Sequence, residues 1–242
     1  MQNFVPGTSR PFDVVIVDES SQCDLLSVGV LALARKAVIV GDDKQTSPNK
    51  VGVKTEQISL LQNRYLDNFP DKTLFTADAS LYSLADRAFG NTIQLREHYR
   101  CVPEIIDYSN RFYDGRISPL RERQHPQIGS PLRCVYCSGA VSEMLGSNRI
   151  NRDEASRLVD QVIRCDKDPA YDGLTFGVVT FMSGSQKDIV FDELMKRLGS
   201  DRMILRRMRV GYPPDFQGDE RDVIFISMVA HDSRPAYTST MY

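Results

Sequence analysis

Two adjacent carboxylates, Asp18 and Glu19, stand directly after the apolar run Val14–Val17 and before the small polar residues Ser20–Gln22. The run is rich in β-branched residues, which predicts a strand buried on both faces of a parallel sheet. The carboxylates would then lie at the carboxyl end of that strand, where open α/β sheets bind their ligands. An Asp at this edge can hold Mg²⁺, and a neighbouring carboxylate can orient or deprotonate a water molecule. A strand that ends in a solvated acidic turn is the alternative.

A second apolar strand, Ala37–Val40, runs into the polar loop Gly41–Pro48. Between the two strands, Leu, Val and Ala recur at helical spacing over Asp24–Arg35, which predicts a helix. A strand, a helix and a second strand form a crossover, which makes the strands parallel and brings both loops to one cleft. We therefore expect Gln45 to share a ligand with the carboxylate pair, with a simple turn as the alternative for the loop.

The rest of the chain shows further helical and strand patterns, so the sequence predicts an α/β protein. The predicted helices are Ser80–Phe89, Arg152–Cys165 and Lys187–Leu198, and the predicted strands are Thr92–Leu95, Leu174–Phe181, Met203–Val210 and Val223–Val229. A domain boundary is predicted near Phe89–Thr92.

The composition is that of an ordinary globular protein, with 242 residues, 41% hydrophobic and 26% charged. The net charge of −2 neither supports nor excludes nucleic acid as a partner. No apolar run approaches the roughly 18 residues that span a bilayer, and the N-terminus lacks a signal pattern. The five scattered cysteines predict a reducing, cytoplasmic location. A structural zinc site needs four ligands, so buried thiols of a strand are the favoured interpretation of the lone C-x-x-C at Cys134–Cys137.

Five segments together resemble the superfamily-one helicases of the type that includes the nonsense-mediated-decay RNA helicase and its DNA-directed relatives. The similarity runs from about Phe12 to Ser227, nearly the whole chain. The segments are Asp18–Gln22 (similar to motif II, the Walker B element), Gly41–Pro48 (motif III), Leu95–Arg100 (motif IV), Gly177–Thr180 with Gln186 (the element between motifs IV and V) and Phe216–Glu220 (motif V).

The resemblance implies ATP and Mg²⁺ as cofactors and gives roles to the residues of the first two segments. Asp18 would hold Mg²⁺, directly or through water, and Glu19 would polarise the attacking water. Gln45 would sense the γ-phosphate of ATP and couple it to the nucleic-acid strand. Asp18, Glu19 and Gln45 are thus the nucleotide and catalytic residues of this part of the chain.

The resemblance also implies nucleotide contacts in the second half of the chain. Arg100 would be an arginine finger that places positive charge on the transferring phosphate. Glu220 would contact the ribose or the phosphates, in a loop shaped by Gln217–Gly218. The alternative for Arg100 is a surface ion pair with Glu97 or Glu104.

The implied partner is single-stranded nucleic acid, with DNA favoured over RNA although the residues do not settle the choice. Ser47, Pro48 and Thr180 would contact the strand, and loop capping is the alternative for Ser47 and Thr180. No membrane partner is implied, and the sequence does not indicate an oligomeric state.

The fold implied by the resemblance is a P-loop NTPase of the α/β class with two RecA-like parallel-sheet lobes, the first incomplete. Residues 1–90 would be the C-terminal part of the first lobe, and residues 91–242 the second lobe with a truncated C-terminal end. No Gly-x-x-x-x-Gly-Lys-Ser/Thr sequence and no motif VI occur in the chain. We therefore expect part of a helicase or translocase that hydrolyses ATP in its parent protein and is inactive as an isolated chain. The alternative is a non-catalytic nucleic-acid- or protein-binding module derived from a helicase.

An unrelated α/β hydrolase or a methyltransferase lacks support from the sequence. Neither Gly-x-Ser-x-Gly nor Gly-x-Gly-x-x-Gly occurs in it.

Overall fold

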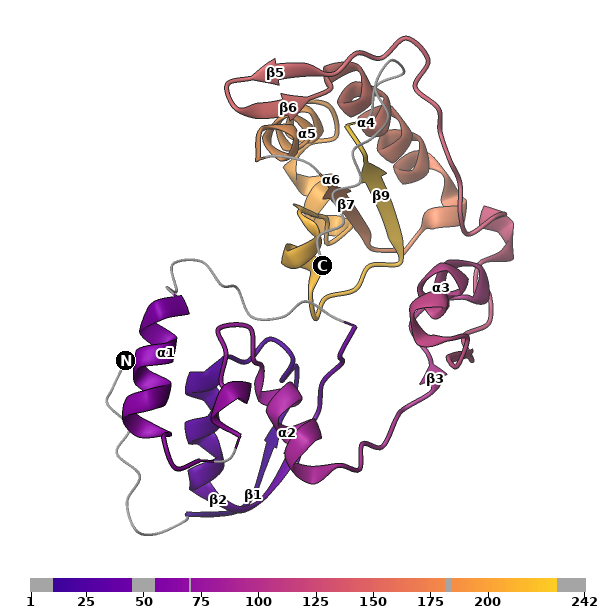
Figure 1. Cartoon of the computed structure of the whole chain (residues 1–242). Coiled ribbons are helices and arrows are strands. Elements are labelled where there is room, and N and C mark those ends of the chain that lie inside the picture. Colours follow the sequence, from indigo (N-terminus) through magenta and orange to yellow (C-terminus); the bar gives the residue numbers. More distant parts are fainter. Residues whose placement is uncertain (1–10, 45–54, 70, 182–183, 230–242) are drawn as a thin grey trace. The chain divides into compact units, whose positions relative to one another are not determined.

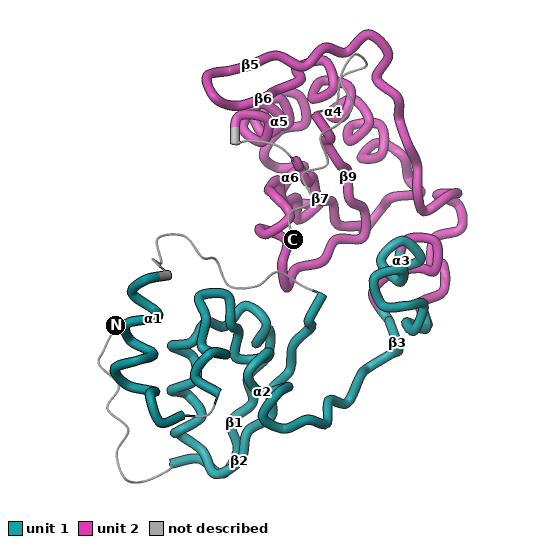
Figure 2. The backbone as a smooth tube through the Cα atoms, in the orientation of Figure 1, with its two compact units in different colours: residues 1–99, 106–120, 242 teal, residues 100–105, 121–241 magenta. Residues whose placement is uncertain are grey.

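The computed structural model describes residues 11–44, 55–69, 71–181 and 184–229. The chain divides into two compact units (Figure 2). The first unit contains residues 1–99 and 106–120, and the second contains residues 100–105 and 121–241. The division into functional domains 1–90 and 91–242 stays a prediction.

In the first unit, β1 (Phe12–Val17) and β2 (Ala34–Ile39) form a two-stranded parallel sheet (Figure 1). The predicted parallel pairing is confirmed. The connection is η1 (Leu25–Leu33), a 3₁₀-helix that begins after Asp24, whose carboxylate accepts the backbone N–H of Leu26 at 3.0 Å. The predicted helix Asp24–Arg35 is therefore wrong at its end. Pairing with β1 draws residues 34–36 into the strand, so the helix cannot continue to Arg35.

The prediction that β1 is buried on both faces is also wrong. Phe12, Val14 and Ile16 are 57%, 47% and 69% exposed. The alternate residues Val15 and Val17 are less exposed, because they lie on the other face of the strand. Among the described elements, η1 and α2 (Leu81–Phe89) contact this small sheet, and they leave one apolar face uncovered.

The remaining helices of the first unit include α1 (Thr55–Tyr65) and η2 (Lys72–Leu74). The predicted helix Ser80–Phe89 is confirmed as α2. Ser80 accepts the N–H of Ser83 while the Ser83 hydroxyl accepts the N–H of Ser80, which caps the first turn. Gly90, with φ +68°, ends the helix in the left-handed conformation that glycine adopts freely.

A short parallel pair, β3 (Glu97–His98) and β4 (Ser118–Pro119), brackets α3 (Pro103–Asn110) and η3 (Arg111–Tyr113). The predicted strand Thr92–Leu95 is wrong, because the structure has no strand before β3 in this segment. Ile93 and Leu95 are 89% and 85% exposed, so these apolar side chains do not pack against a sheet.

The second unit is built on the three-stranded parallel sheet β8–β7–β9, formed by Arg209–Gly211, Phe176–Thr180 and Val223–Ser227. The helices α4 (Arg152–Lys167) and α5 (Gly184–Arg197) pack against it (Figure 1). Their apolar stripes meet one face of the sheet in a core that includes Ala155, Val159, Val162, Phe176, Val178, Val190 and Leu194. The smaller elements are the antiparallel hairpin β5 (Glu143–Leu145) and β6 (Asn148–Ile150), and the 3₁₀ turns η4 (Pro126–Ile128), η5 (Pro169–Tyr171) and η6 (Pro213–Phe216).

Two sequence predictions fail in this unit. The segment Met203–Val210 was predicted to be one strand, but α6 (Ser200–Leu205) occupies its first half and β8 only its end. Met203 is buried in the core from the helix, so tertiary packing overrides the strand pattern. In the C-x-x-C, Cys134 is exposed and Cys137 partly exposed, in a segment without a strand, so the interpretation as buried strand thiols is wrong.

The structure confirms a mixed α/β fold with small parallel sheets. In the part of the chain that the structure describes, no helix has both the length and the apolar character needed to cross a membrane.

Candidate functional site

Asp18 and Glu19 are exposed at the carboxyl end of β1, as predicted from the sequence. The Asp18 carboxylate accepts the backbone N–H of Glu19 at 2.8 Å. The Glu19 carboxylate accepts a hydrogen bond from the side-chain amide of Gln22 at 3.0 Å. Glu19 has φ +52°, a left-handed conformation that residues other than glycine adopt seldom and that often occurs at functional sites.

The next two residues, Ser20 and Ser21, join this turn to the end of β2. Ser20 donates to the carbonyl of Val40 through both its backbone N–H, at 2.9 Å, and its hydroxyl, at 2.6 Å. The Ser21 hydroxyl accepts the N–H of Asp42 at 2.6 Å and donates to the Asp42 carbonyl at 2.7 Å. Both serines are buried. The structure therefore brings the carboxylate turn and the start of the Gly41–Pro48 loop together.

Gly41 lies where these two segments touch. A Cβ atom at this position would lie 2.7 Å from the Ser20 hydroxyl, 2.7 Å from the Tyr82 ring and 2.8 Å from the Ser21 hydroxyl. Such distances are far below van der Waals contact, so only a residue without a side chain fits. The glycine thus permits the close approach of the two loops.

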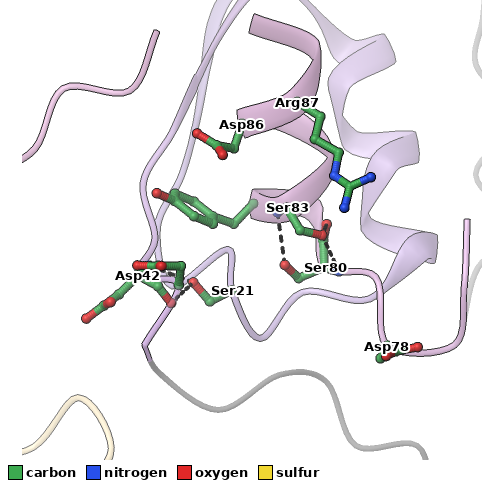
Figure 3. Close-up of a pocket in the computed structure, with 9 residues that line it drawn as sticks. Ser21, Asp42, Asp78, Ser80, Ser83, Asp86 and Arg87 are labelled. Carbon is green, nitrogen blue, oxygen red and sulfur yellow. Dashed lines mark hydrogen bonds between the residues drawn. The ribbon is translucent and has the colours of Figure 1, made fainter. Parts of the chain in front are cut away.

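A cavity of ≈ 270 Å³ lies beside this junction (Figure 3). Hydroxyl and carboxylate groups dominate its wall, which is formed by Ser21, Asp42, Asp43, Asp78, Ser80, Tyr82, Ser83, Asp86 and Arg87. In Figure 3 the side chains of α2 lie across from Ser21 and Asp42 of the strand-end loops. Burial and the nearby carboxylates, Asp86 foremost, raise the pKa of Tyr82, because each disfavours a phenolate.

Asp42 makes a further contact that sequence reasoning missed. Its Oδ1 accepts the backbone N–H of Lys44 at 2.9 Å, and its Oδ2 accepts the hydroxyl of Tyr113 at 2.5 Å. Both partners of the Tyr113 bond belong to the first unit. No periodicity links two side chains that stand 71 positions apart, so the sequence carries no signal for this pair.

In the second unit, the structure brings two predicted residues together. Arg100 Nε donates to Glu220 Oε2 at 3.0 Å. The alternative ion pairs of Arg100 are not formed, because Glu97 accepts the Tyr99 hydroxyl and Glu104 accepts Arg123. An ion pair this exposed, at 58% and 68%, contributes at most about 1 kcal/mol, so a ligand could displace it at little cost.

The loop that carries Glu220 is held by its neighbour Asp219. Asp219 pairs with Arg209 at 2.7 Å and with Arg221 at 2.5 Å, and these two guanidinium groups lower the pKa of Asp219 to about 2. Gly218 has φ +71°, which a side chain would disfavour. Gln217 ends the η6 turn just before it. The loop is therefore fixed by its own ion pairs, with the Glu220 carboxylate exposed beside Arg100.

Thr180 ends β7, and its side chain is completely buried. Among the described residues, its hydroxyl has no hydrogen-bond partner. Next to this strand end, Gln186 Nε2 donates to the Ser227 hydroxyl and to the Asn151 carbonyl, both at 3.1 Å, while Gln186 Oε1 accepts the Asn151 N–H at 2.8 Å. The nucleic-acid contact of Thr180 stays a prediction. Gln45, Ser47 and Pro48 lie outside the described residues.

The donor atoms at the end of β1 fit Mg²⁺. Asp18 and Glu19 offer only oxygen atoms and are exposed, and Mg²⁺ is usually held by one or two carboxylates together with water and substrate phosphates. Within residues 11–44, 55–69, 71–181 and 184–229, no group of three or more His, Cys, Asp or Glu side chains is arranged to hold a metal by itself. Asp18 thus suits a cation that a bound nucleotide also ligates.

Comparisons with known proteins place these residues in a family. The sequence pattern of a family described as “AAA domain” matches residues 77–238, more than half of the chain. The chain is 27% identical to the “ATP-dependent helicase upf1” of Schizosaccharomyces pombe, over 90% of the chain and 23% of the relative. It is 24% identical to the “Probable RNA helicase armi” of Drosophila melanogaster, over 90% of the chain and 20% of the relative.

A third relative, the human “Probable helicase senataxin”, is 25% identical over 92% of the chain and 8% of its own length. The chain thus spans less than a quarter of each of these three relatives.

Proposed function

The chain belongs to the AAA domain family, among the superfamily-one helicases, and from this premise we propose that it forms part of the motor of an ATP-dependent helicase. The motor hydrolyses ATP to ADP and phosphate and uses the free energy to move along a single strand of nucleic acid. The observation that carries the proposal is the junction made by Ser20 and Ser21. It holds the exposed carboxylates of Asp18 and Glu19 beside the loop that leads to Gln45.

The residues of the first unit supply the chemistry of hydrolysis in this proposal. Asp18 would hold Mg²⁺, and the ion would supply positive charge against that of the ATP phosphates. Glu19 orients and polarises the attacking water, and its position in a turn fixed by Asp18 and Gln22 favours a single orientation. Gln45 contacts the γ-phosphate.

The residues of the second unit bind the nucleotide. Arg100 places its guanidinium on the transferring phosphate, and Glu220 binds the ribose or the phosphates in the loop formed with Gln217 and Gly218. The ion pair between Arg100 and Glu220 is exposed and weak, so the two side chains are available to a nucleotide.

The nucleic-acid strand is proposed to contact Ser47 and Pro48. The printed names of the relatives include an “RNA helicase” and two helicases without a stated nucleic acid, so both RNA and DNA belong in the test. Two RecA-like lobes, with domains 1–90 and 91–242, and a cytoplasmic location complete the proposal.

The test is ATP hydrolysis by the full-length protein that contains this chain, with and without single-stranded RNA or DNA. We expect turnover that nucleic acid stimulates. Asp18→Asn and Glu19→Gln keep the size of each side chain and remove its charge, so each should reduce the stimulated rate at least about 100-fold. Asp13→Asn, on the exposed part of β1, is the matched control and should leave the rate unchanged.

Other outcomes separate the alternatives. Binding of single-stranded nucleic acid without any ATP turnover would favour a non-catalytic module derived from a helicase. Turnover that survives both carboxylate substitutions would contradict the roles of Asp18 and Glu19.

A further inference from the structure

Asp42 joins three segments of the first unit that are distant in sequence. Its backbone exchanges hydrogen bonds with the Ser21 hydroxyl, at 2.6 and 2.7 Å. Its Oδ1 accepts the N–H of Lys44 at 2.9 Å, which fixes the first turn of the loop that continues to Gln45. Its Oδ2 accepts the Tyr113 hydroxyl at 2.5 Å. The carboxylate turn, the following loop and η3 thus meet at one residue, the first through its backbone and the other two through its carboxylate.

The Tyr113 hydroxyl is a well-defined donor. Burial, followed by the hydrogen bond to Asp42, raises the pKa of Tyr113 well above its usual value, so the phenol stays protonated across the physiological range. The turn after Tyr113 is closed by Asn110, whose side chain accepts the N–H of Ile117 at 2.8 Å and donates to its carbonyl at 3.0 Å. The half-buried ring therefore has little freedom to turn away from Asp42.

We propose that Tyr113 is a positioning residue, whose hydroxyl acts through Asp42 to hold the start of the Gly41–Pro48 loop. The proposal rests on the function proposed above. In that function, the loop must place Gln45 when ATP is hydrolysed. Tyr113 touches neither ATP nor nucleic acid in this proposal, and its effect passes through Asp42.

The experiment uses the full-length protein and the change Tyr113→Phe, which removes one hydroxyl and keeps the ring. We expect the nucleic-acid-stimulated kcat for ATP to fall about tenfold, the scale of one hydrogen bond to a charged group. The KM for ATP should change by less than about twofold, because Tyr113 makes no ground-state contact with ATP. Tyr108→Phe makes the same chemical change on an exposed tyrosine of α3 and should have no effect.

A second arm tests whether the effect passes through Asp42. Asp42→Asn keeps the shape of the side chain and removes its charge, so it should lower the stimulated kcat by itself. In the Asp42→Asn background, Tyr113→Phe should then lower the stimulated kcat by less than about threefold. The effects of two substitutions that break the same hydrogen bond do not add. A full tenfold loss in that background would overturn the proposal.

A third arm separates positioning from support of the fold, and also from failure of the proposed function. Tyr113→Phe should increase amide hydrogen exchange at Lys44 and leave the midpoint of thermal unfolding unchanged. A lower midpoint, together with equal losses of the basal and the stimulated rates of ATP hydrolysis, would show a structural role and overturn the proposal. If the wild type hydrolyses no ATP, the function above fails, yet the exchange at Lys44 still reports the contact. Unchanged exchange and unchanged kcat would overturn the inference alone.

Discussion

Gly41 shows how much a single residue decides at the junction of the two loops. Its missing side chain leaves room for the hydroxyls of Ser20 and Ser21 and the ring of Tyr82. Gly41→Ala would force these groups apart, and overpacking of this kind costs about 1–3 kcal/mol of folding free energy. We expect a lower urea midpoint and a loss of ATP hydrolysis by the full-length protein, since the Asp18 turn and the loop must move.

Gly29→Ala is the matched control for this change. Nothing lies within 4 Å of the Cβ position at Gly29, so the free energy of unfolding should change by less than about 0.5 kcal/mol. Equal effects of the two alanines on urea unfolding would show that the close approach at Gly41 does not matter.

The residues at strand ends were accessible to sequence reasoning, whereas their partners were not. Asp18 and Glu19 follow an apolar strand pattern, and the structure places them at its end. The resemblance named Arg100 and Glu220 without pairing them, and they are 120 positions apart. Tyr113 was missed altogether, because a hydrogen bond between distant segments leaves no periodic pattern in the sequence.

Among the elements of the second unit, α6 is tied to α4 by a buried charge cluster. The Asp166 carboxylate, 5% exposed, pairs with Arg206 at 2.7 Å and with Arg202 at 2.8 Å. The Arg206 guanidinium is 3% exposed and stacks over the Phe176 ring at 4.7 Å. Breaking a buried pair from one side costs about 3–5 kcal/mol, so Arg206→Ala should strongly lower the free energy of unfolding of this unit.

The pH dependence of unfolding gives this prediction its control. Burial by itself would raise the pKa of Asp166, but the ion pairs with Arg202 and Arg206 outweigh burial and lower it. A lowered pKa adds stability that is present above the unfolded value, about 3.9, and is lost as the pH falls through the lower folded value. Arg206→Ala should weaken this acid loss in urea titrations between about pH 5 and pH 2. An unchanged pH dependence of the free energy of unfolding would contradict the role of the ion pair between Asp166 and Arg206.

The elements that the sequence predicted well have strong local signals. In α2, the apolar stripe agrees with the Ser80 cap and with Gly90, and the predicted helix is confirmed, beginning one residue later at Leu81. The start of β2 and the fold of α6 depend on contacts with other segments. Pairing with β1 extends β2 back to Ala34, and the Asp166 cluster holds the end of α6, so local pattern misjudged both.

At the scale of the whole molecule, the order of weak segments was more informative than any one of them. The helicase family was predictable from that order, and the α/β class from the helical and strand patterns; both are confirmed. The exposure of the sheets was not predictable in the same way. The apolar pattern of β1 predicts a buried strand. Burial, however, depends on which elements cover the sheet, and the pattern of one strand does not specify those elements.

The uncovered sheet faces lead to a prediction about the isolated 242-residue chain. Phe12, Val14 and Ile16 form an exposed apolar row on β1, and Ile224 and Ile226 are 41% and 50% exposed on β9. Contiguous apolar surface and open strand edges favour association between chains. We expect the isolated chain to self-associate as its concentration rises in sedimentation velocity experiments.

Ile16→Lys should weaken this association without unfolding the chain. Burial of one Ile side chain contributes about 1.5–3 kcal/mol, so the apparent dissociation constant should rise at least about tenfold. Leu26→Lys makes the same kind of change on η1, where Leu26 is 78% exposed but lies off the strand row, and it should have a smaller effect. If both lysines weaken association equally, general surface hydrophobicity drives it, and the β1 row has no special part. If the wild type stays monomeric at all concentrations, the exposed apolar area on these sheets does not cause association, and the prediction is wrong.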